Sequence, residues 1–327
     1  MKKASEKAEV NTTSCIIVIF PGSKAQDIIA PNADVYVTSG STVGNIHTSC
    51  DVWVEDDVSF AYIAARNVHL GNANNGWTVT AWSQKSGDNV EGGNIQVGVS
   101  NRITALEASG DIFIGVSNRI SMVKSYQGDV KVDAYNTFEF IEASGMVEIG
   151  CKNGILQHTF ANESVLCKDD NVIPVIYSLE DIKLGEKCLV EKCASFNGNI
   201  ETKAFTQVQV IEDSVDVIIG NHNTVGKIVS KGSVAVINFC TVGFVYGFIG
   251  LKEYSYILEN YLVNQIFKDL IPFNKGESLN LSINVLINSY KIIKAYVIGI
   301  ALNSKKAITE DEIIRVIQSL SKDIEHN

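Results

Sequence analysis

Apolar residues recur along most of this chain at a step of 17 or 18 residues. The six residues Gly98–Ile103, GVSNRI, return unchanged as Gly115–Ile120, 17 residues later. Glycines at positions 115, 150, 185 and 220 continue the pattern at intervals of 35 residues, so that steps of 17 and 18 alternate. A unit this short cannot bury its own apolar side, and such units stack so that neighbours share one core.

Four columns of apolar residues follow this step. The first two columns lie two residues apart, which places them on one face of a strand. The third and fourth columns follow 8 and 11 residues after the first, beginning at Ile103 and Leu106. The first column consists of Ile95, Ile112, Val130, Val147, Val165, Ile182, Ile200, Val217 and Ala235, and the second runs from Val97 to Ile237. The fourth consists of Leu106, Val123, Ile141, His158, Ile176, Cys193, Ile211 and Ile228. The same offsets predict that Val18, Phe20 and Ile29 open the array.

This repeat predicts a mainly β fold, a right-handed parallel β-helix (β-solenoid) of about 13 coils over residues 15–250. The offsets do not fit a hexapeptide array, which repeats every six residues, and this favours the right-handed form. Coils stacked at the inter-strand spacing would form a rod about 60 Å long. A polar tail, residues 1–14, precedes the solenoid, and an α-helical module, residues 251–327, follows it.

Asparagine occupies one turn position in five successive repeats. Amide side chains in this position can hydrogen-bond along the axis as a ladder, and asparagine tolerates the left-handed backbone of a turn. A ligand groove is the functional alternative, but turn chemistry favours the structural role. The predicted ladder consists of Asn101, Asn118, Asn136, Asn153 and Asn171.

The repeat is interrupted between Val79 and Ile95 by an inserted loop, Trp82–Gly93 (WSQKSGDNVEGG). Long loops on rigid scaffolds often carry function, and a tolerated surface insertion is the alternative. The polar and aromatic residues of this loop form the candidate interaction site. They are Trp82, Gln84, Lys85, Asp88, Asn89 and Glu91.

Residues with catalytic or ligating chemistry are sparse. The five histidines show no metal-ligand spacing, and the chain has no HExxH, GxSxG, P-loop or CxxC motif. The sequence therefore predicts no metal site and no cofactor, and its catalytic residues, if any, stay unknown. His158 falls in the fourth apolar column, which predicts an interior histidine satisfied by hydrogen bonds. Cys188 and Cys193 are too few to complete a metal site.

A row of aspartates raises the alternative of a polysaccharide-cleaving β-helix, in which several carboxylates lie on one sheet face. Here they stand just before the first strand of each repeat, a turn position where aspartate favours local backbone hydrogen bonds. The structural role is therefore the favoured interpretation. The row consists of Asp111, Asp129, Asp181 and Asp216.

Charge and cysteine content limit the partners and the compartment. The net charge is −10, and residues 1–250 hold 18 basic against 28 acidic side chains, which counts against a nucleic-acid partner. Seven irregularly spaced cysteines suit reduced thiols in a cytoplasmic protein. No signal peptide or membrane span is expected, because the long apolar stretch 279–302 is interrupted by Asn, Ser and Lys.

The C-terminal residues have the helical period. Residues 253–270 place apolar side chains on one stripe that ends before Pro272, and Thr309 with Glu312 forms a capping box before a last amphipathic helix. The segments Leu258–Phe267 (LENYLVNQIF), Leu270–Phe273 (LIPF) and Thr309–Asn327 resemble the C-terminal part of the flagellin lysine-N-methylase family. The resemblance covers about the last 70 residues. It implies methylation of surface lysines on flagellin, but the family's N-terminal cysteine cluster has no counterpart here, so no catalytic residue is transferred.

The repeat region resembles bactofilins, cytoskeletal proteins that polymerise through a β-helix, in coil length. A helical module at one end of a solenoid is expected to cap exposed strand edges. The sequence predicts a non-catalytic scaffold or interaction module with a protein partner, and a homo-oligomer stays open. An enzyme is the alternative, related to the lysine methylase or, less favoured, acting on a polysaccharide.

Overall fold

The computed structural model describes residues 15–86, 89–249, 287–288, 290, 292–293, 296 and 313–319. The side chains of residues 84–91 and 246–249 lie outside this description. Contacts divide the chain into two units, residues 1–247 and 248–327. The predicted N-terminal tail and most of the predicted helical module, with its capping box, lie outside the described residues.

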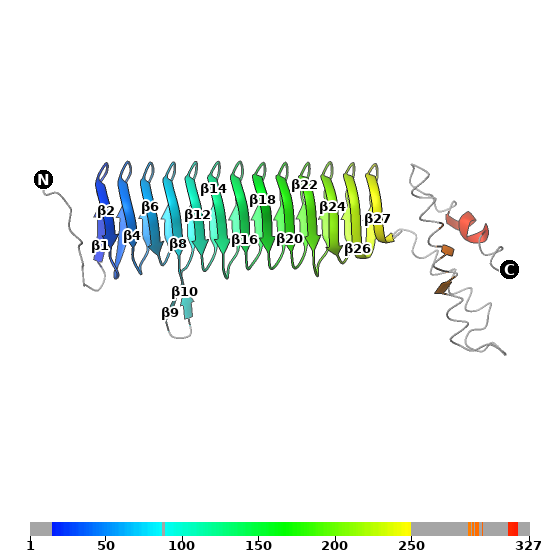
Figure 1. The fold of residues 1–327 in the computed structure, drawn as a ribbon, viewed down its shortest axis with the longest axis horizontal. Helices are drawn as coiled ribbons and strands as arrows, with labels where there is room; N and C mark the ends of the chain where they lie inside the picture. Colours follow the sequence, from blue (N-terminus) through cyan, green and yellow to red (C-terminus); the bar gives the residue numbers. More distant parts are fainter. Residues whose placement is uncertain are drawn as a thin grey trace. The chain divides into compact units, whose positions relative to one another are not determined.

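The first unit is a parallel β-solenoid, as the repeat predicted (Figure 1). Each of 13 coils contributes one short strand and one long strand. The short strands are β1 Cys15–Ile19, β3 Ala33–Val37, β5 Val52–Val54, β7 Val68–Leu70, β11 Ile95–Val97, β13 Ile112–Ile114, β15 Val130–Val132, β17 Val147–Ile149, β19 Val165–Cys167, β21 Ile182–Leu184, β23 Ile200–Thr202 and β25 Val217–Ile219. The long strands are β2 Lys24–Ile29, β4 Thr42–His47, β6 Ser59–Ala65, β8 Asn75–Ala81, β12 Arg102–Ala108, β14 Arg119–Ser125, β16 Thr137–Ala143, β18 Gly154–Ala161, β20 Val172–Ser178, β22 Leu189–Ser195, β24 Gln207–Ser214, β26 Thr224–Val236 and β27 Thr241–Ile249. β26 serves both stacks, because its first part pairs with β24 and its last three residues pair with β25.

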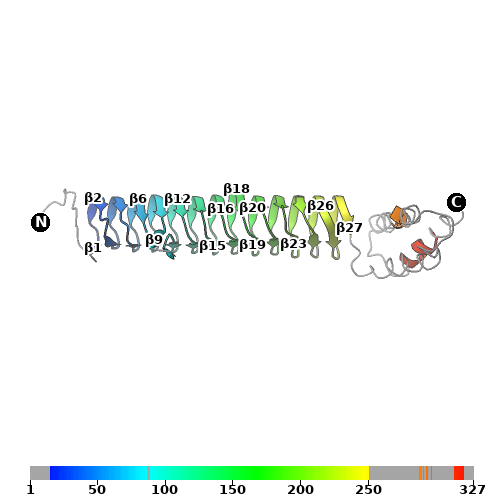
Figure 2. The same cartoon turned by 90° about the horizontal axis from the view of Figure 1, so that it is seen from below.

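Like strands of successive coils pair in parallel, so that the solenoid contains two continuous stacks (Figure 2). The long strands bend once. In β14, Ile120 pairs with Phe138 and Met122 pairs with Phe140, whereas Ser121 between them is skipped. Inward side chains accordingly fall at Ile120, Val123 and Ser125 on the two sides of the bend. Each coil therefore has three straight sides around one interior.

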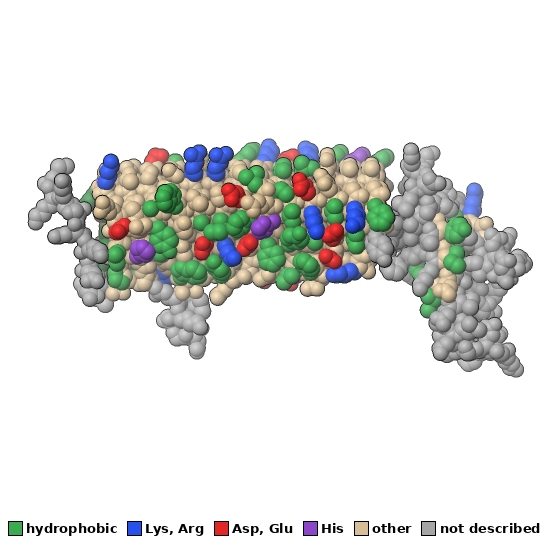
Figure 3. Space-filling model, viewed as in Figure 1, with side chains coloured by type: hydrophobic (Ala, Val, Ile, Leu, Met, Phe, Trp, Pro, Cys, Tyr) green, Lys and Arg blue, Asp and Glu red, His purple; other side chains and the backbone are tan. Residues whose placement is uncertain are grey.

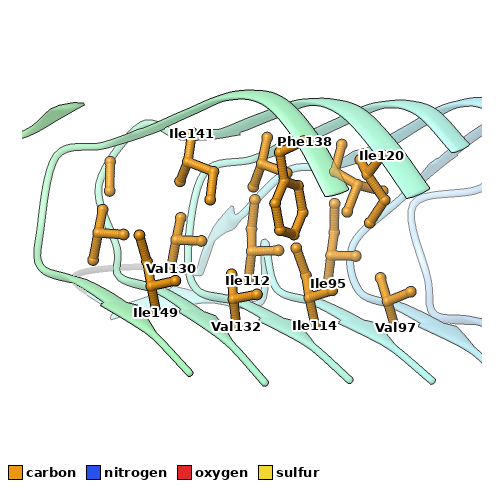
Figure 4. Close-up of a cluster of buried hydrophobic side chains, with 14 of the residues drawn as sticks. Ile95, Val97, Ile112, Ile114, Ile120, Val130, Val132, Phe138, Ile141 and Ile149 are labelled. Atoms are coloured by element: carbon orange, nitrogen blue, oxygen red, sulfur yellow. The ribbon is translucent and has the colours of Figure 1, made fainter. Parts of the chain in front are cut away.

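The predicted apolar columns fill that interior (Figure 4). Ile95, Ile112, Val130 and Val147 are fully buried and stack on one another in the register of their strands. Branched side chains suit this position because they pack well on a pleated surface. Each coil thus buries its apolar side against its neighbours, as the sequence predicted.

The predicted register was wrong at both ends of the array. At the N-terminus, Ile17 and Ile19 pair with Val35 and Val37, whereas Val18 and Phe20 are exposed. Ile28, not Ile29, is the buried residue of β2. At the other end, Val217 pairs with Val234, so the inward residues are Val234 and the position of Val236, not Ala235 and Ile237. The step is 18 at the first of these coils and 17 at the last, the reverse of the assumed alternation.

The prediction that His158 is an interior residue was also wrong. β18 has eight residues where most long strands have seven, and its register shifts between Phe138 and Phe140. The extra residue moves His158 outward opposite Phe140, on which it stacks at 5.2 Å between ring centroids. Its Nε2 lies 3.2 Å from Glu142 Oε1. Thr159 takes the buried place in the column.

In the second unit, residues 287–288, 290, 292–293, 296 and 313–319 are helical. Ile313 and Ile317, four residues apart, are buried, which agrees with the amphipathic pattern predicted for the last helix. No helix in the described part of the chain is long and apolar enough to cross a membrane.

Candidate functional site

The inserted segment forms a β-hairpin on the solenoid. β9 Gln84–Ser86 pairs antiparallel with β10 Asn89–Glu91 (Figure 1). The stack continues beneath it, because β11 pairs with β7 across the insertion. Sequence analysis expected a loop here, and the backbone instead pairs with itself. Asp88 lies outside the described residues, as do the side chains of Gln84, Lys85, Asn89 and Glu91, so their contribution stays a prediction.

Two close contacts fix the base of the hairpin. The Ser83 N–H donates to Ser109 Oγ at 2.6 Å, and the Gly93 N–H donates to the Arg66 carbonyl at 2.7 Å. Gly93 has φ +86°, and a Cβ there would lie 2.1 Å from Ser109 Oγ. Glycine is therefore required where the chain returns from the hairpin to the coil.

A shallow hollow of about 360 Å³ lies beside this base. Its walls are largely apolar, and Trp82, the residue that leads into the hairpin, forms one of them. Trp82 is 46% exposed and stacks on Tyr126 at 5.5 Å. The hollow exists because small side chains from preceding coils face this large indole. Its lining consists of Ile29, Pro31, His47, Thr48, Ser49, Ala64, Ala65, Arg66, Trp82 and Ser83.

The one charged side chain in this lining is neutralised within the solenoid. Arg66 Nε and Nη2 donate to the two carboxylate oxygens of Asp51 at 2.8 and 2.9 Å. Burial alone would raise the pKa of Asp51, but the hydrogen bonds and charge of Arg66 outweigh it and hold that pKa below its ordinary value. The hollow therefore presents an apolar surface with a fixed polar rim.

A second hollow, about 400 Å³, adjoins a ridge of stacked rings on the short strands. Trp53 lies between Tyr36 and His69, with ring centroids 4.6 and 5.5 Å apart and planes within 8° of parallel. Each ring covers the face of the next, so the faces of Trp53 are occupied within the chain. Glu55 is the carboxylate in this lining, and the hollow beside Trp82 contains none.

The five predicted ladder asparagines do form a ladder. The Asn101 N–H donates to Asn118 Oδ1 at 2.8 Å, Asn118 N–H to Asn136 Oδ1 at 2.6 Å, and the series continues through Asn153 to Asn171. All five side chains are at most 2% exposed. Three residues that sequence analysis missed occupy the same position, Asn74, Thr206 and Asn223. The ladder is structural, since its amides bond to backbone groups of neighbouring coils.

The backbone geometry of this turn differs from the prediction. The left-handed residue is the one before each ladder position, for example Ser100 at φ 60°, Ser117 at φ 60° and Lys152 at φ 58°. The asparagines themselves are not left-handed. Some of these exposed corner residues stack between coils, and His222 lies 5.0 Å from both Phe205 and Phe239.

The aspartate row forms a second ladder, between coils and not within one turn as expected. Asp111 Oδ1 accepts the Asp129 N–H at 2.9 Å, and Asp129 Oδ1 accepts the Met146 N–H at 2.7 Å. Asp181 and Asp216 do the same for the coils that follow them. These carboxylates hold successive turns together.

The cysteines and other candidate ligands are dispersed or buried. Burial raises the pKa of Cys193 to about 12 and that of Cys188 to about 11, so both stay protonated thiols near neutral pH. Among the described residues, no group of three or more His, Cys, Asp or Glu side chains is placed to hold a metal ion.

Comparison with known protein families adds information at the C-terminus. Residues 244–327 match the FliB lysine N-methylase C-terminal domain. The resemblance noted from the sequence is thereby confirmed. The match covers the last 84 of 327 residues, and nearly all of the solenoid precedes it. Searches of curated proteins and of solved structures returned no match to this chain.

Proposed function

We propose that this chain is a non-catalytic scaffold that binds a protein partner at the hollow beside Trp82 and the β9–β10 hairpin. The observation that carries the proposal is Trp82 itself, a large indole 46% exposed at the wall of an apolar hollow. Tryptophan is enriched among the residues that dominate binding energy at protein interfaces. The stack of coils beneath supplies a rigid support.

The hairpin favours a protein over a small molecule as the occupant. A two-stranded ribbon of three residues per strand is marginally stable alone. Its outer edges carry backbone groups that an extended segment of a partner can pair with, while a side chain of that segment fills the hollow. Binding would thereby stabilise the ribbon.

The remaining polar chemistry of the solenoid supports a scaffold. The carboxylates of Asp111 and Asp129 accept backbone N–H groups, and Glu142 and Glu148 pair with lysines. Cys188 and Cys193 are buried thiols with raised pKa values. These groups have structural partners that would have to be broken before they could act on a substrate.

A photo-cross-linking residue at Ser83 tests the proposal, with the partner then purified and its affinity measured. We expect Trp82→Ala to weaken that complex by about 30-fold, because truncating an anchor tryptophan costs about 2 kcal/mol or more. Trp77→Ala is the matched control, since Trp77 is 73% exposed but does not line the hollow. Equal affinities of the two variants would refute the site.

The family match favours a second candidate, a lysine N-methylase. It rests on residues 244–327, which match the C-terminal domain of such enzymes. Incubating the purified full-length chain with S-adenosylmethionine and a lysine-rich protein, followed by mass spectrometry of the lysines, tests it. Methyl-lysine formed in proportion to the amount of chain would replace the scaffold proposal with an enzymatic one.

A further inference from the structure

The repeated hexapeptide GVSNRI places two arginines and two serines on adjacent coils. Arg102 on β12 pairs directly with Arg119 on β14. Ser100 and Ser117 lie two residues before them at equivalent corners, and the Ser100 N–H donates to the Val116 carbonyl at 3.0 Å. All four side chains are exposed. Basic side chains are visible along the upper edge of the solenoid in Figure 3.

These four side chains have no partner within the described part of the chain. None of its ion pairs or side-chain hydrogen bonds includes Arg102, Arg119, Ser100 or Ser117. The neighbours of the arginines in register are Asn75 and Thr137, which are uncharged. Like charges directly opposite each other on paired strands are destabilising.

Other long-strand cations are treated differently. Lys124 pairs with Glu142 at 3.1 Å, and Lys192 pairs with Glu212 at 2.8 Å. A solenoid with an acidic excess thus supplies carboxylates to these lysines and none to the two arginines. The arginine pair is a local cationic site on an otherwise acidic surface.

We propose that Arg102, Arg119, Ser100 and Ser117 form a binding site for a phosphate monoester group. Adjacent coils are about 4.8 Å apart, so both guanidinium groups can reach one phosphate from neighbouring levels. Each guanidinium presents a planar fork of donors that matches phosphate oxygens, and the hydroxyls add two donors. A phosphate monoester carries nearly two negative charges and three strong acceptor oxygens, which match two cations and two hydroxyls. A carboxylate has one charge and two oxygens and fits less well.

Isothermal titration calorimetry of the full-length chain at low ionic strength tests the site. The probes are inorganic phosphate, a phosphoserine peptide, the same peptide without phosphate, and acetate. We expect millimolar or tighter binding of the two phosphate probes, about tenfold weaker binding by Arg102→Gln or Arg119→Gln, and loss in the double variant. Lys183→Gln is the matched control, because Lys183 is exposed on β21 and belongs to no described ion pair.

The probes also separate two sources of the phosphate. Tighter binding of the phosphopeptide than of inorganic phosphate supports a phosphorylated protein, and equal binding supports a small phosphate ester. Acetate binding as tight as phosphate, or phosphate binding unchanged in the double variant, would overturn the assignment. Phosphate should also raise the melting temperature of the wild type and not that of the double variant. This readout shows that the variant is folded.

Discussion

Removing one rung of the asparagine ladder should destabilise its coils far more than removing an exposed amide. In Asn118→Ala the buried Asn101 N–H loses its acceptor, Asn118 Oδ1 at 2.8 Å. The Gly98 carbonyl loses the donor Asn118 Nδ2 at 2.9 Å. Each unsatisfied buried backbone group costs about 1–3 kcal/mol, so we expect a loss of about 3 kcal/mol in the free energy of unfolding.

Hydrogen exchange is the appropriate assay, because each coil of a solenoid is stabilised by its neighbours and can open locally. A loss of about 3 kcal/mol corresponds to roughly 100-fold faster exchange in residues 98–120. Asn199→Ala is the control, since Asn199 is exposed and accepts one N–H at 3.1 Å. Asn118→Thr should recover part of the loss, as Thr206 fills the same position by donating to the Gly185 carbonyl at 2.7 Å. Equal effects of the two alanine variants would refute the reasoning.

Three further predictions concern the corners, the ion pair and the thiols. Ala73→Gly should leave the free energy of unfolding unchanged or raise it by up to about 1 kcal/mol in a denaturant titration, because Ala73 has φ 55°, whereas Ala105→Gly within β12 should lower it. Asp51 has a lowered pKa, so its pair with Arg66 stabilises the fold above pH 3.8, the ordinary value for this group, and the stabilisation is lost as the pH falls through the lowered pKa. Acid unfolding curves should therefore show a smaller fall in stability over this range for Arg66→Gln than for the wild type. At pH 8 a thiol reagent should leave Cys188 and Cys193 unmodified in the folded chain and modify them in denaturant, as peptide mapping would show; modification of either thiol in the folded chain would contradict their burial.

The parallel stack was predictable because its pairing partners are separated by a nearly constant distance in the sequence. Ile95, Ile112 and Val130 can be aligned without structural knowledge, and they are adjacent in space. The ends were mispredicted because two apolar residues stand side by side there, as in Ile17 and Val18. The choice of a 17- or 18-residue step depends on the length of the turn, which apolar periodicity does not report.

The candidate site was predictable only in position. A broken register located the insertion, but the hollow depends on side chains from several coils. Ala64 and Ala65 leave space only because Trp82 stands one coil later, and Trp82 is supported by Tyr126 from a coil further on. No local pattern reports that such residues meet. The unpaired state of Arg102 and Arg119 is likewise a property of neighbouring coils.

The interrupted column at β18 leads to a last prediction. Thr159 is fully buried between Ile141 and Ile176, and its Oγ1 has no hydrogen-bond partner. A buried hydroxyl without a partner costs about 1–3 kcal/mol, and valine has nearly the same shape. We therefore expect Thr159→Val to raise the free energy of unfolding by about 1 kcal/mol. Thr202→Val is the matched control and should lower it, because Thr202 Oγ1 accepts the Asn223 amide at 2.8 Å. If denaturant titrations showed both variants losing stability alike, the hydroxyl of Thr159 would have to be satisfied after all.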